Sequence, residues 1–261
     1  MSIHEKIIQI GNHSIYTQFI ESELPAPSPL IVFLHEGLGC VEMWKGFPEK
    51  LCALTGYSGF LYDRKGYGKS TTWQSSLSID FLKEEARELP DVLQKAGIHQ
   101  PVILLGHSDG GSIALYAASD PRLDVKAVIV EAPHVLIEEE TRLGLLQTRQ
   151  LWESGILTHK LKKYHGDKAG ILFQEWIRLW LSEVGLQWQM LDDLIKIKAP
   201  LLFIQGDRDH FATMKQWDEI QKRVQGNKEK IFIEKCGHIP HLEMEKFVTT
   251  SMADFLKSLK V

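Results

Sequence analysis

Six short apolar runs, separated by helix-length segments, constrain the fold of this 261-residue sequence more than any other feature. Runs of this kind are typical of parallel strands that are covered on both faces. They read LIVFLH (30–35), GFLY (59–62), PVILLG (101–106), VKAVIVEA (125–132), PLLFIQG (200–206) and KIFIEKC (230–236). Amphipathic segments at 79–96, 111–119, 214–224 and 242–259 lie between or after these runs. The alternation predicts an α/β fold with a mostly parallel, doubly wound sheet.

Residues 134–197 interrupt the alternation, because they contain helical patterns and no strand-like run. We interpret them as a helical lid inserted into the sheet domain. The chain is then divided into core residues 1–133, lid residues 134–197 and core residues 198–261. At the other end of the chain, the alternating runs 5–10 and 14–19 predict an antiparallel hairpin that precedes the parallel strands.

The composition excludes several classes of protein. A formal net charge of -4, with 25% charged residues, gives no basic surface for nucleic acid. The three cysteines have no paired spacing, so the sequence predicts neither a disulfide framework nor a zinc site. No segment approaches the ~20 apolar residues of a membrane-spanning helix, and the first residues lack an apolar signal region. We therefore expect a cytoplasmic protein with no nucleic-acid or membrane partner.

The stretch LLGHSDGGSIAL (104–115) places two candidate nucleophiles, Ser108 and Asp109, side by side between glycines. It follows an apolar strand and precedes a helical pattern, which is the context of the G-x-S-x-G nucleophile elbow. In this sharp turn Ser108 occupies the strained apex, and Gly106 and Gly110 let the strand and the helix approach each other. Asp109 then offers its backbone N–H to an oxyanion. The alternative interpretation is a glycine-rich helix start used only for packing.

Four motifs of the chain resemble those of the α/β-hydrolase family, and the resemblance runs from the 30–35 strand to the last helix. They are HEGLG (35–39), DRKGYGKS (63–70), GHSDGG (106–111), and GDRD (206–209) followed by GHIPH (237–241). Their order matches the family's order of serine, acid and histidine. The resemblance implies a sheet of the α/β-hydrolase type. Dehalogenase-like and epoxide-hydrolase-like relatives carry Asp at the apex, so Ser108 at that place favours ester-type chemistry.

A serine hydroxyl is a weak nucleophile at neutral pH, so it needs a nearby base that is oriented by an acid. The resemblance places the base in the loop after the last strand, where His238 is the candidate. His241, three residues later, is the alternative. The family's G-x-x-D pattern, counted from Gly206, selects Asp209 as the acid, and Asp207 is the alternative.

The HEGLG loop is expected to supply the second oxyanion donor, from the N–H of Gly37 or, as an alternative, of Leu38. The loop departs from the family pattern because Glu36 stands where glycine is common. Its carboxylate either turns to a polar partner behind the loop or contacts substrate. Trp176 and Trp180 lie four residues apart, so both rings project from one face of a helix. They form either part of the core or a hydrophobic pocket over the nucleophile.

These assignments predict a serine hydrolase that cleaves a small to medium carboxylic ester or related acyl compound through an acyl-enzyme. The expected partner is a small hydrophobic acyl or aromatic substrate, and no metal or organic cofactor is expected. Two alternatives stay open. One is a hydrolase of carbon–carbon bonds in aromatic ring-cleavage products, which uses the same triad. The other is a small-molecule receptor of the same fold with slow turnover.

Overall fold

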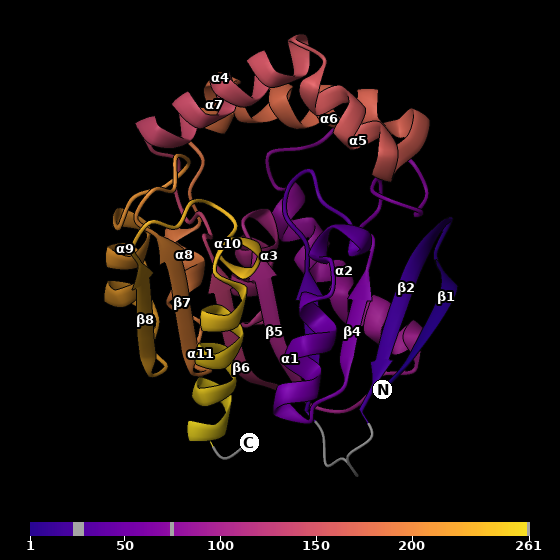
Figure 1. The fold of residues 1–261 in the computed structure, drawn as a ribbon, viewed down its shortest axis with the longest axis vertical. Helices are drawn as coiled ribbons and strands as arrows, with labels where there is room; N and C mark the ends of the chain where they lie inside the picture. The colour runs from indigo at the N-terminus through magenta and orange to yellow at the C-terminus, as the bar shows by residue number, and fades with distance from the viewer. Residues whose placement is uncertain (23–28, 74–75, 260–261) are drawn as a thin grey trace.

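The computed structural model describes residues 1–22, 29–73 and 76–259. Its centre is an eight-stranded sheet with the order β1-β2-β4-β3-β5-β6-β7-β8 (Figure 1). β1 and β2 form an antiparallel hairpin, β2 pairs antiparallel with β4, and the other neighbours are parallel. The strands are β1 (Ser2–Ile10), β2 (His13–Glu21), β3 (Leu30–Leu34), β4 (Gly59–Tyr62), β5 (Val102–His107), β6 (Val125–Glu131), β7 (Leu201–Gly206) and β8 (Lys228–Ile233). The predicted α/β fold with a mostly parallel sheet is confirmed.

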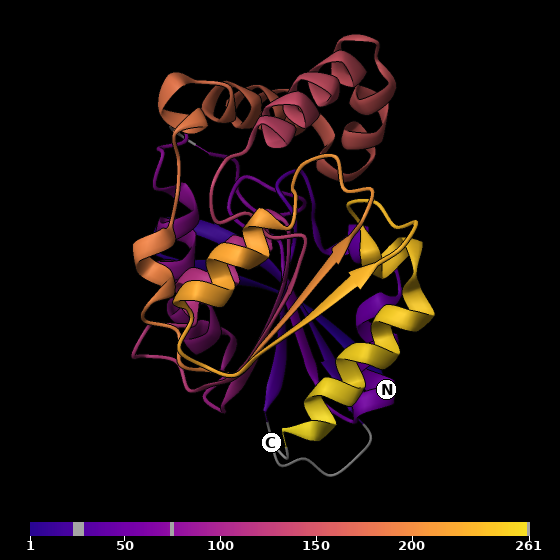
Figure 2. The same ribbon diagram turned by 90° about the vertical axis from the view of Figure 1, so that its left-hand side faces the viewer.

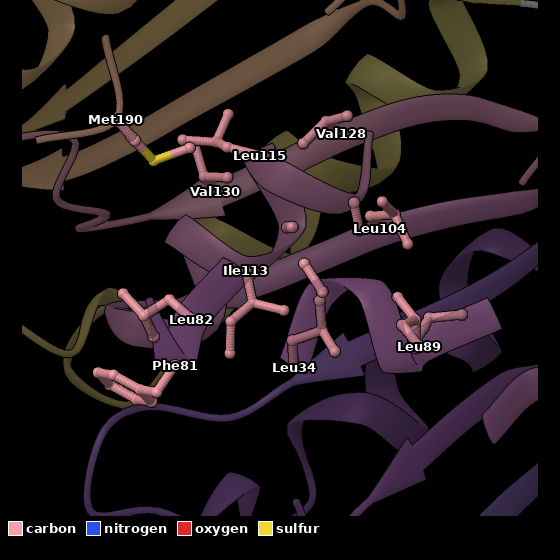
Figure 3. Packing of buried hydrophobic residues seen from close by; sticks show 14 of the residues in the cluster. Leu34, Phe81, Leu82, Leu89, Leu104, Ile113, Leu115, Val128, Val130 and Met190 are labelled. Carbon is pink, nitrogen blue, oxygen red and sulfur yellow. The ribbon is translucent and has the colours of Figure 1, made fainter. Parts of the chain in front are cut away.

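Helices cover both faces of the sheet, and Figure 2 shows α9 and α11 on opposite sides of the strands. They are α1 (Phe47–Thr55), α2 (Phe81–Ala96), α3 (Asp109–Ala117), α9 (Lys215–Arg223), α10 (Pro240–Glu243) and α11 (Glu245–Ser258), with a short 3-10 helix η1 (Val41–Trp44). Each central strand sends alternate side chains to the two faces. In β3, Val32 and Leu34 join the cluster under α2, α3 and α9 (Figure 3), whereas Ile31 and Phe33 join the cluster under α1 and α11.

The long segment between β6 and β7 is helical. It contains α4 (Glu139–Glu153), α5 (Ile156–His165), a 3-10 turn η2 (Gly166–Lys168), α6 (Ala169–Trp180), α7 (Glu183–Leu186) and α8 (Leu191–Leu194). Figure 1 shows α4 to α7 spread above the carboxyl ends of the parallel strands. α8 differs from them, because it packs against α3 and α9 on the side of the sheet. Within the described ranges, no helix combines the length and apolar character needed to cross a membrane.

The predicted bounds differ from the observed ones by up to three residues at most elements, and at the last strand and the last helix the backbone gives the reason. The 230–236 run ends as a strand at Ile233, because Lys235 adopts a left-handed φ of 60° that interrupts extended pairing. The predicted helix at 242–259 is two helices: α10 starts at Pro240, and the chain changes direction at Met244, whose ψ of 41° is not helical, before α11 begins. Both differences lie in the segment that follows β8, which also carries His238.

The contact between β5 and α3 predicts a large effect of one methyl group. A Cβ added at Gly106 would lie 2.1 Å from the Gly110 carbonyl oxygen, so backbone would have to shift. We expect Gly106→Ala to lower the free energy of unfolding by about 1–3 kcal/mol, the usual cost of overpacking. Urea unfolding measures this change.

Gly170→Ala is the matched control, because a Cβ there would meet nothing within 4 Å. Gly170 lies in α6, where alanine is favoured over glycine by about 0.5–1 kcal/mol. The control should therefore be neutral or stabilising. Equal stabilities for the two variants would contradict the close approach.

Candidate active site

Ser108 lies at the sharp turn between β5 and α3. Its φ of 55° and ψ of -120° are rare for a residue with a side chain. The turn is fixed from both sides, because the Ser108 N–H donates to the Glu131 carbonyl oxygen at 2.9 Å and a Cβ at Gly110 would lie 2.0 Å from the Leu34 carbonyl oxygen. The structure therefore holds the Ser108 hydroxyl at the carboxyl end of the sheet, where ligands of α/β proteins bind.

His238 and Asp209 meet Ser108 there, each from the loop that follows a different strand. His238 Nε2 lies 3.0 Å from Ser108 Oγ, and His238 Nδ1 lies 2.9 and 3.0 Å from the two carboxylate oxygens of Asp209. Burial raises the pKa of Asp209, but the charge and hydrogen bond of His238 and the N–H of Phe211 outweigh it and hold that pKa below its ordinary value. An ionised Asp209 accepts from Nδ1–H, which leaves Nε2 free to accept the Ser108 proton.

The two alternative residues lie elsewhere. His241 is 2% exposed, contacts Glu131 Oε2 through Nδ1 at 2.7 Å and packs against the ring of Trp44. Asp207 accepts a hydrogen bond from the Cys236 N–H at 3.3 Å. Neither has a hydrogen bond to the atoms that surround Ser108 Oγ. His238 and Asp209, and not His241 and Asp207, therefore have the positions expected of a general base and the acid that orients it.

A cavity of about 230 Å³ opens over Ser108 and His238. The four residues predicted for the pocket line it: Glu36, Leu38, Trp176 and Trp180. The two predicted oxyanion donors, Gly37 and Asp109, line it as well. Helices α4 and α5 also contribute to the wall, which was not predicted from the sequence; they add Leu145, Thr148, Leu151, Leu157 and Leu161. The spacing of three residues between positions 145, 148 and 151 is a helical signal that marks one face of α4. The cavity wall is therefore largely apolar, and half of the residues that line it come from the 134–197 segment.

Asp109 and Gly37 pack together beside the nucleophile. Trp176 Nε1 donates to Asp109 Oδ2 at 3.2 Å, and a Cβ at Gly37 would lie 2.5 Å from that Nε1. Only glycine fits at position 37 without displacing one of these groups. Asp109 is also the first residue of α3, so its backbone N–H has no partner within the helix. The two candidate oxyanion donors therefore belong to segments in direct contact.

The side chain of Glu36 turns toward His107. Glu36 Oε2 lies 3.7 Å from His107 Nδ1, and His107 Nε2 contacts the backbone oxygen of His238 at 2.8 Å. Burial lowers the pKa of His107, but Glu36 and the neighbouring acceptors outweigh it, so the net pKa lies above its ordinary value. Burial likewise raises the pKa of Glu36, yet His107 and other contacts hold it well below its ordinary range. Glu36 and His107, which form an ion pair whenever His107 is protonated, therefore connect the HEGLG loop with the loop that carries His238.

The DRKGYGKS motif holds the HEGLG loop in place through buried polar side chains. Arg64 is 1% exposed, and its guanidinium donates to Glu85 at 2.7 Å and to the Glu36 carbonyl oxygen at 2.8 Å. The Asp63 carboxylate accepts from the Val41 N–H at 2.7 Å and from the Lys69 N–H at 2.6 Å. The motif is thus a buried polar scaffold for residues 36–41. The charges of Asp63 and Arg64 are visible in the sequence, but the partners of these two residues could not be predicted from it.

The described residues contain no cluster of three or more His, Cys, Asp or Glu side chains that could hold a metal ion. A family model described as the alpha/beta hydrolase family matches residues 31–250. The chain belongs to the alpha/beta hydrolase family. It is therefore an enzyme of the hydrolase type, and the match runs from β3 into the first half of α11.

One curated protein and two solved structures illustrate how far the resemblance to known proteins extends. The 2-succinyl-6-hydroxy-2,4-cyclohexadiene-1-carboxylate synthase of Yersinia pestis bv. Antiqua (strain Nepal516) is 27% identical over 208 residues, which cover 70% of this chain and 73% of that protein. A serine hydrolase involved in carbazole degradation, the CarC enzyme, superposes with a TM-score of 0.76 at 18% identity, over 98% of this chain and 99% of that one. The enol-lactonase of Burkholderia xenovorans LB400 superposes with a TM-score of 0.72 at 17% identity, over 97% and 100% of the two chains. The two solved structures establish the fold alone.

The Glu36–His107 pair predicts a pH-dependent contribution to stability. The pKa of His107 is higher in the folded protein than in the unfolded chain. Its contribution to the free energy of unfolding is therefore complete below the pKa of the unfolded chain, and it is lost as the pH rises through the pKa of the folded protein. The lowered pKa of Glu36 means that its contribution is present above its unfolded pKa and is lost only in acid. We therefore expect Glu36→Gln to destabilise the protein more at about pH 6 than at about pH 9.

Urea unfolding at both pH values measures the difference. Glu42→Gln is the control, because Glu42 is exposed and its ion-pair partner among the described residues is the exposed Lys69, at 3.2 Å. Its small effect should be the same at both pH values. An equal destabilisation by Glu36→Gln at pH 6 and pH 9 would argue against the ion pair.

Proposed function

We propose that this chain is a serine hydrolase that cleaves a carboxylic ester or related acyl compound through an acyl-enzyme. The observation that carries the proposal is the chain of contacts from Ser108 Oγ through His238 to Asp209, at 3.0 and 2.9 Å, on the floor of an apolar cavity. A nucleophile within reach of a base, which is in turn oriented by an acid, is the arrangement required for acyl transfer.

In the proposed mechanism His238 takes the proton of Ser108 as the hydroxyl attacks the acyl carbon. Asp209 holds the imidazole in the tautomer that can accept this proton and stabilises the resulting imidazolium. The backbone N–H groups of Asp109 and Gly37 receive the oxyanion, and each such donor contributes about 3–4 kcal/mol to transition-state stabilisation. His238 then returns the proton to the leaving group, and water releases the acyl chain in a second round.

The cavity wall favours an uncharged, hydrophobic substrate. Besides its histidines, the charged side chains that line it are Glu36, Asp109 and Lys160, and two of these three are negative. An anionic substrate would meet the carboxylate of Asp109, the residue next to the nucleophile, and repulsion between like charges is unfavourable. The name of the Yersinia relative includes a carboxylate, and an enol-lactone contains a cyclic ester, which is the type of bond that the proposed mechanism cleaves. We therefore propose neutral esters or lactones as the substrate class.

The nucleophile and the base are tested together with p-nitrophenyl esters and a fluorophosphonate probe. We expect Ser108→Ala and His238→Ala each to lower kcat by at least about 10³-fold, since removing one member of a triad removes most of its contribution. The probe should label Ser108 in the native chain. Labelling that persists in Ser108→Ala would contradict the assignment.

His241→Ala is the matched control for the base. It removes an imidazole that packs against Trp44 and Phe47, so it should lower the melting temperature and keep most of the turnover. If His241→Ala loses more turnover than His238→Ala, the two roles are exchanged. A single burst without steady turnover in the native enzyme would instead identify a receptor.

We further propose that residues 134–197 form a lid whose helix α6 sets the depth of the pocket. Trp176 is the test residue, and Trp176→Leu should raise kcat/KM for octanoyl relative to acetyl esters by about tenfold, because it opens room for a longer chain. The substitution also removes the hydrogen bond from Trp176 Nε1 to Asp109, but this loss should change kcat/KM for every ester by the same factor. A change in the ratio between octanoyl and acetyl esters therefore reports the depth of the pocket.

Trp217→Leu is the control for this change, because Trp217 is buried in α9 against Phe203 and lies outside the cavity wall. It should lower the melting temperature and leave the ranking of the esters as it is. An unchanged ranking in Trp176→Leu would remove α6 from the account of specificity.

A further inference from the structure

His134 places a buried ring nitrogen without a hydrogen-bond partner in the wall of the cavity, beside the Asp109 carboxylate. The residue is 9% exposed and lines the pocket together with Ser108, and its Nε2 is buried without a hydrogen-bond partner. Its ring stands edge-on to two tryptophans, with centroids 5.1 Å from Trp180 and 5.2 Å from Trp188. A buried nitrogen without a partner is unfavourable, so a group of this kind in a pocket indicates a polar ligand atom.

The backbone around His134 is fixed before any ligand binds. Ala132 has a left-handed φ of 44°, and its N–H donates to the Ile204 carbonyl oxygen at 2.8 Å. Ser112 Oγ donates to the His134 carbonyl oxygen at 2.5 Å, and the Val135 N–H donates to Gln216 at 2.7 Å. A strained residue held by such contacts beside a cavity is characteristic of a built site. The ring of His134 is thus preorganised.

The Asp109 carboxylate faces the same nitrogen. Asp109 Oδ1 lies 3.4 Å from His134 Nε2, while the other oxygen, Oδ2, accepts from Trp176 Nε1. Burial is the main cause that lowers the pKa of His134, so its imidazole is neutral near pH 7 and each nitrogen either donates or accepts. With its proton on Nε2, His134 is a donor, and Asp109 Oδ1 beside it is an acceptor. A hydroxyl group matches this pair, because it can accept one hydrogen bond and donate another.

We propose that Asp109 and His134 form a subsite for a hydroxyl group of the substrate, close to the bond that Ser108 attacks. The hydroxyl donates to Asp109 Oδ1 and accepts from His134 Nε2–H. This inference rests on the proposed function and narrows its substrate class from neutral esters to esters that carry a hydroxyl near the scissile carbonyl. The hydrogen bond from Trp176 keeps the carboxylate of Asp109 in place.

Matched p-nitrophenyl esters test the subsite: butyrate, 2-hydroxybutyrate and 3-hydroxybutyrate. We expect kcat/KM for at least one hydroxylated ester to exceed that of butyrate by about tenfold or more, after correction for their alkaline hydrolysis rates, since a hydrogen bond to a charged group contributes on this scale. His134→Phe keeps a flat ring between the two tryptophans, and Asp109→Asn keeps the shape. Both substitutions should reduce the ratio of kcat/KM between the hydroxylated ester and butyrate to about one. His134→Gln retains a donor and should restore part of it.

Trp188→Phe is the control, because it disturbs the packing of the His134 ring without removing the nitrogen, and it should keep the preference. The subsite is overturned if the native enzyme shows no preference for a hydroxyl, or if His134→Phe slows all three esters equally while the melting temperature falls, which is the signature of a packing role. Absence of both ester turnover and fluorophosphonate labelling of Ser108 would overturn the proposed function itself, and the subsite with it.

Discussion

The approach of three backbone segments at Gly106, Gly110 and Leu34 is the constraint on which the rest of the site depends. Added Cβ atoms at the two glycines would lie 2.1 and 2.0 Å from carbonyl oxygens, so β3, β5 and the start of α3 are in direct backbone contact. Ser108 has no room to relax from its left-handed φ. Because the HEGLG loop leaves β3 at Leu34, the same contact also brings Gly37 to the side of Asp109. Nucleophile and candidate oxyanion donors are thus positioned by one packing arrangement.

A buried polar network then fixes the loops that carry no regular structure. Arg64 binds the Glu36 carbonyl oxygen, the Glu36 carboxylate faces His107, and His107 contacts the backbone oxygen of His238. The strand ends supply only approximate positions, and these contacts hold the loops at them. Buried charges are tolerated here because each lies beside an opposite charge or a backbone partner. The histidine at position 107 thereby connects the two loops on either side of the nucleophile.

The sequence predicted the fold because its apolar runs and amphipathic segments have different periods, and each period belongs to one type of element. Ser108, His238 and Asp209 were predictable as neighbours, since the motifs that contain them follow parallel strands whose carboxyl ends share one edge. The positions of Glu36 and His134 were not. Which side chains meet in a cavity depends on the paths of several loops, and a single sequence gives no distance between loops. Likewise, helical periodicity located helices within 134–197 but not the face of α4 that covers the cavity.

The hydrogen bond from Trp176 to Asp109 joins the first turn of α3 to a helix from a distant part of the chain. An outward displacement of α6 would withdraw the indole N–H from a carboxylate that is 2% exposed. A buried carboxylate that loses a donor must gain another, and water is the available one. If α6 moved outward and exposed the cavity, water would therefore bind the Asp109 carboxylate. That water would have to leave again before α6 could return to its place.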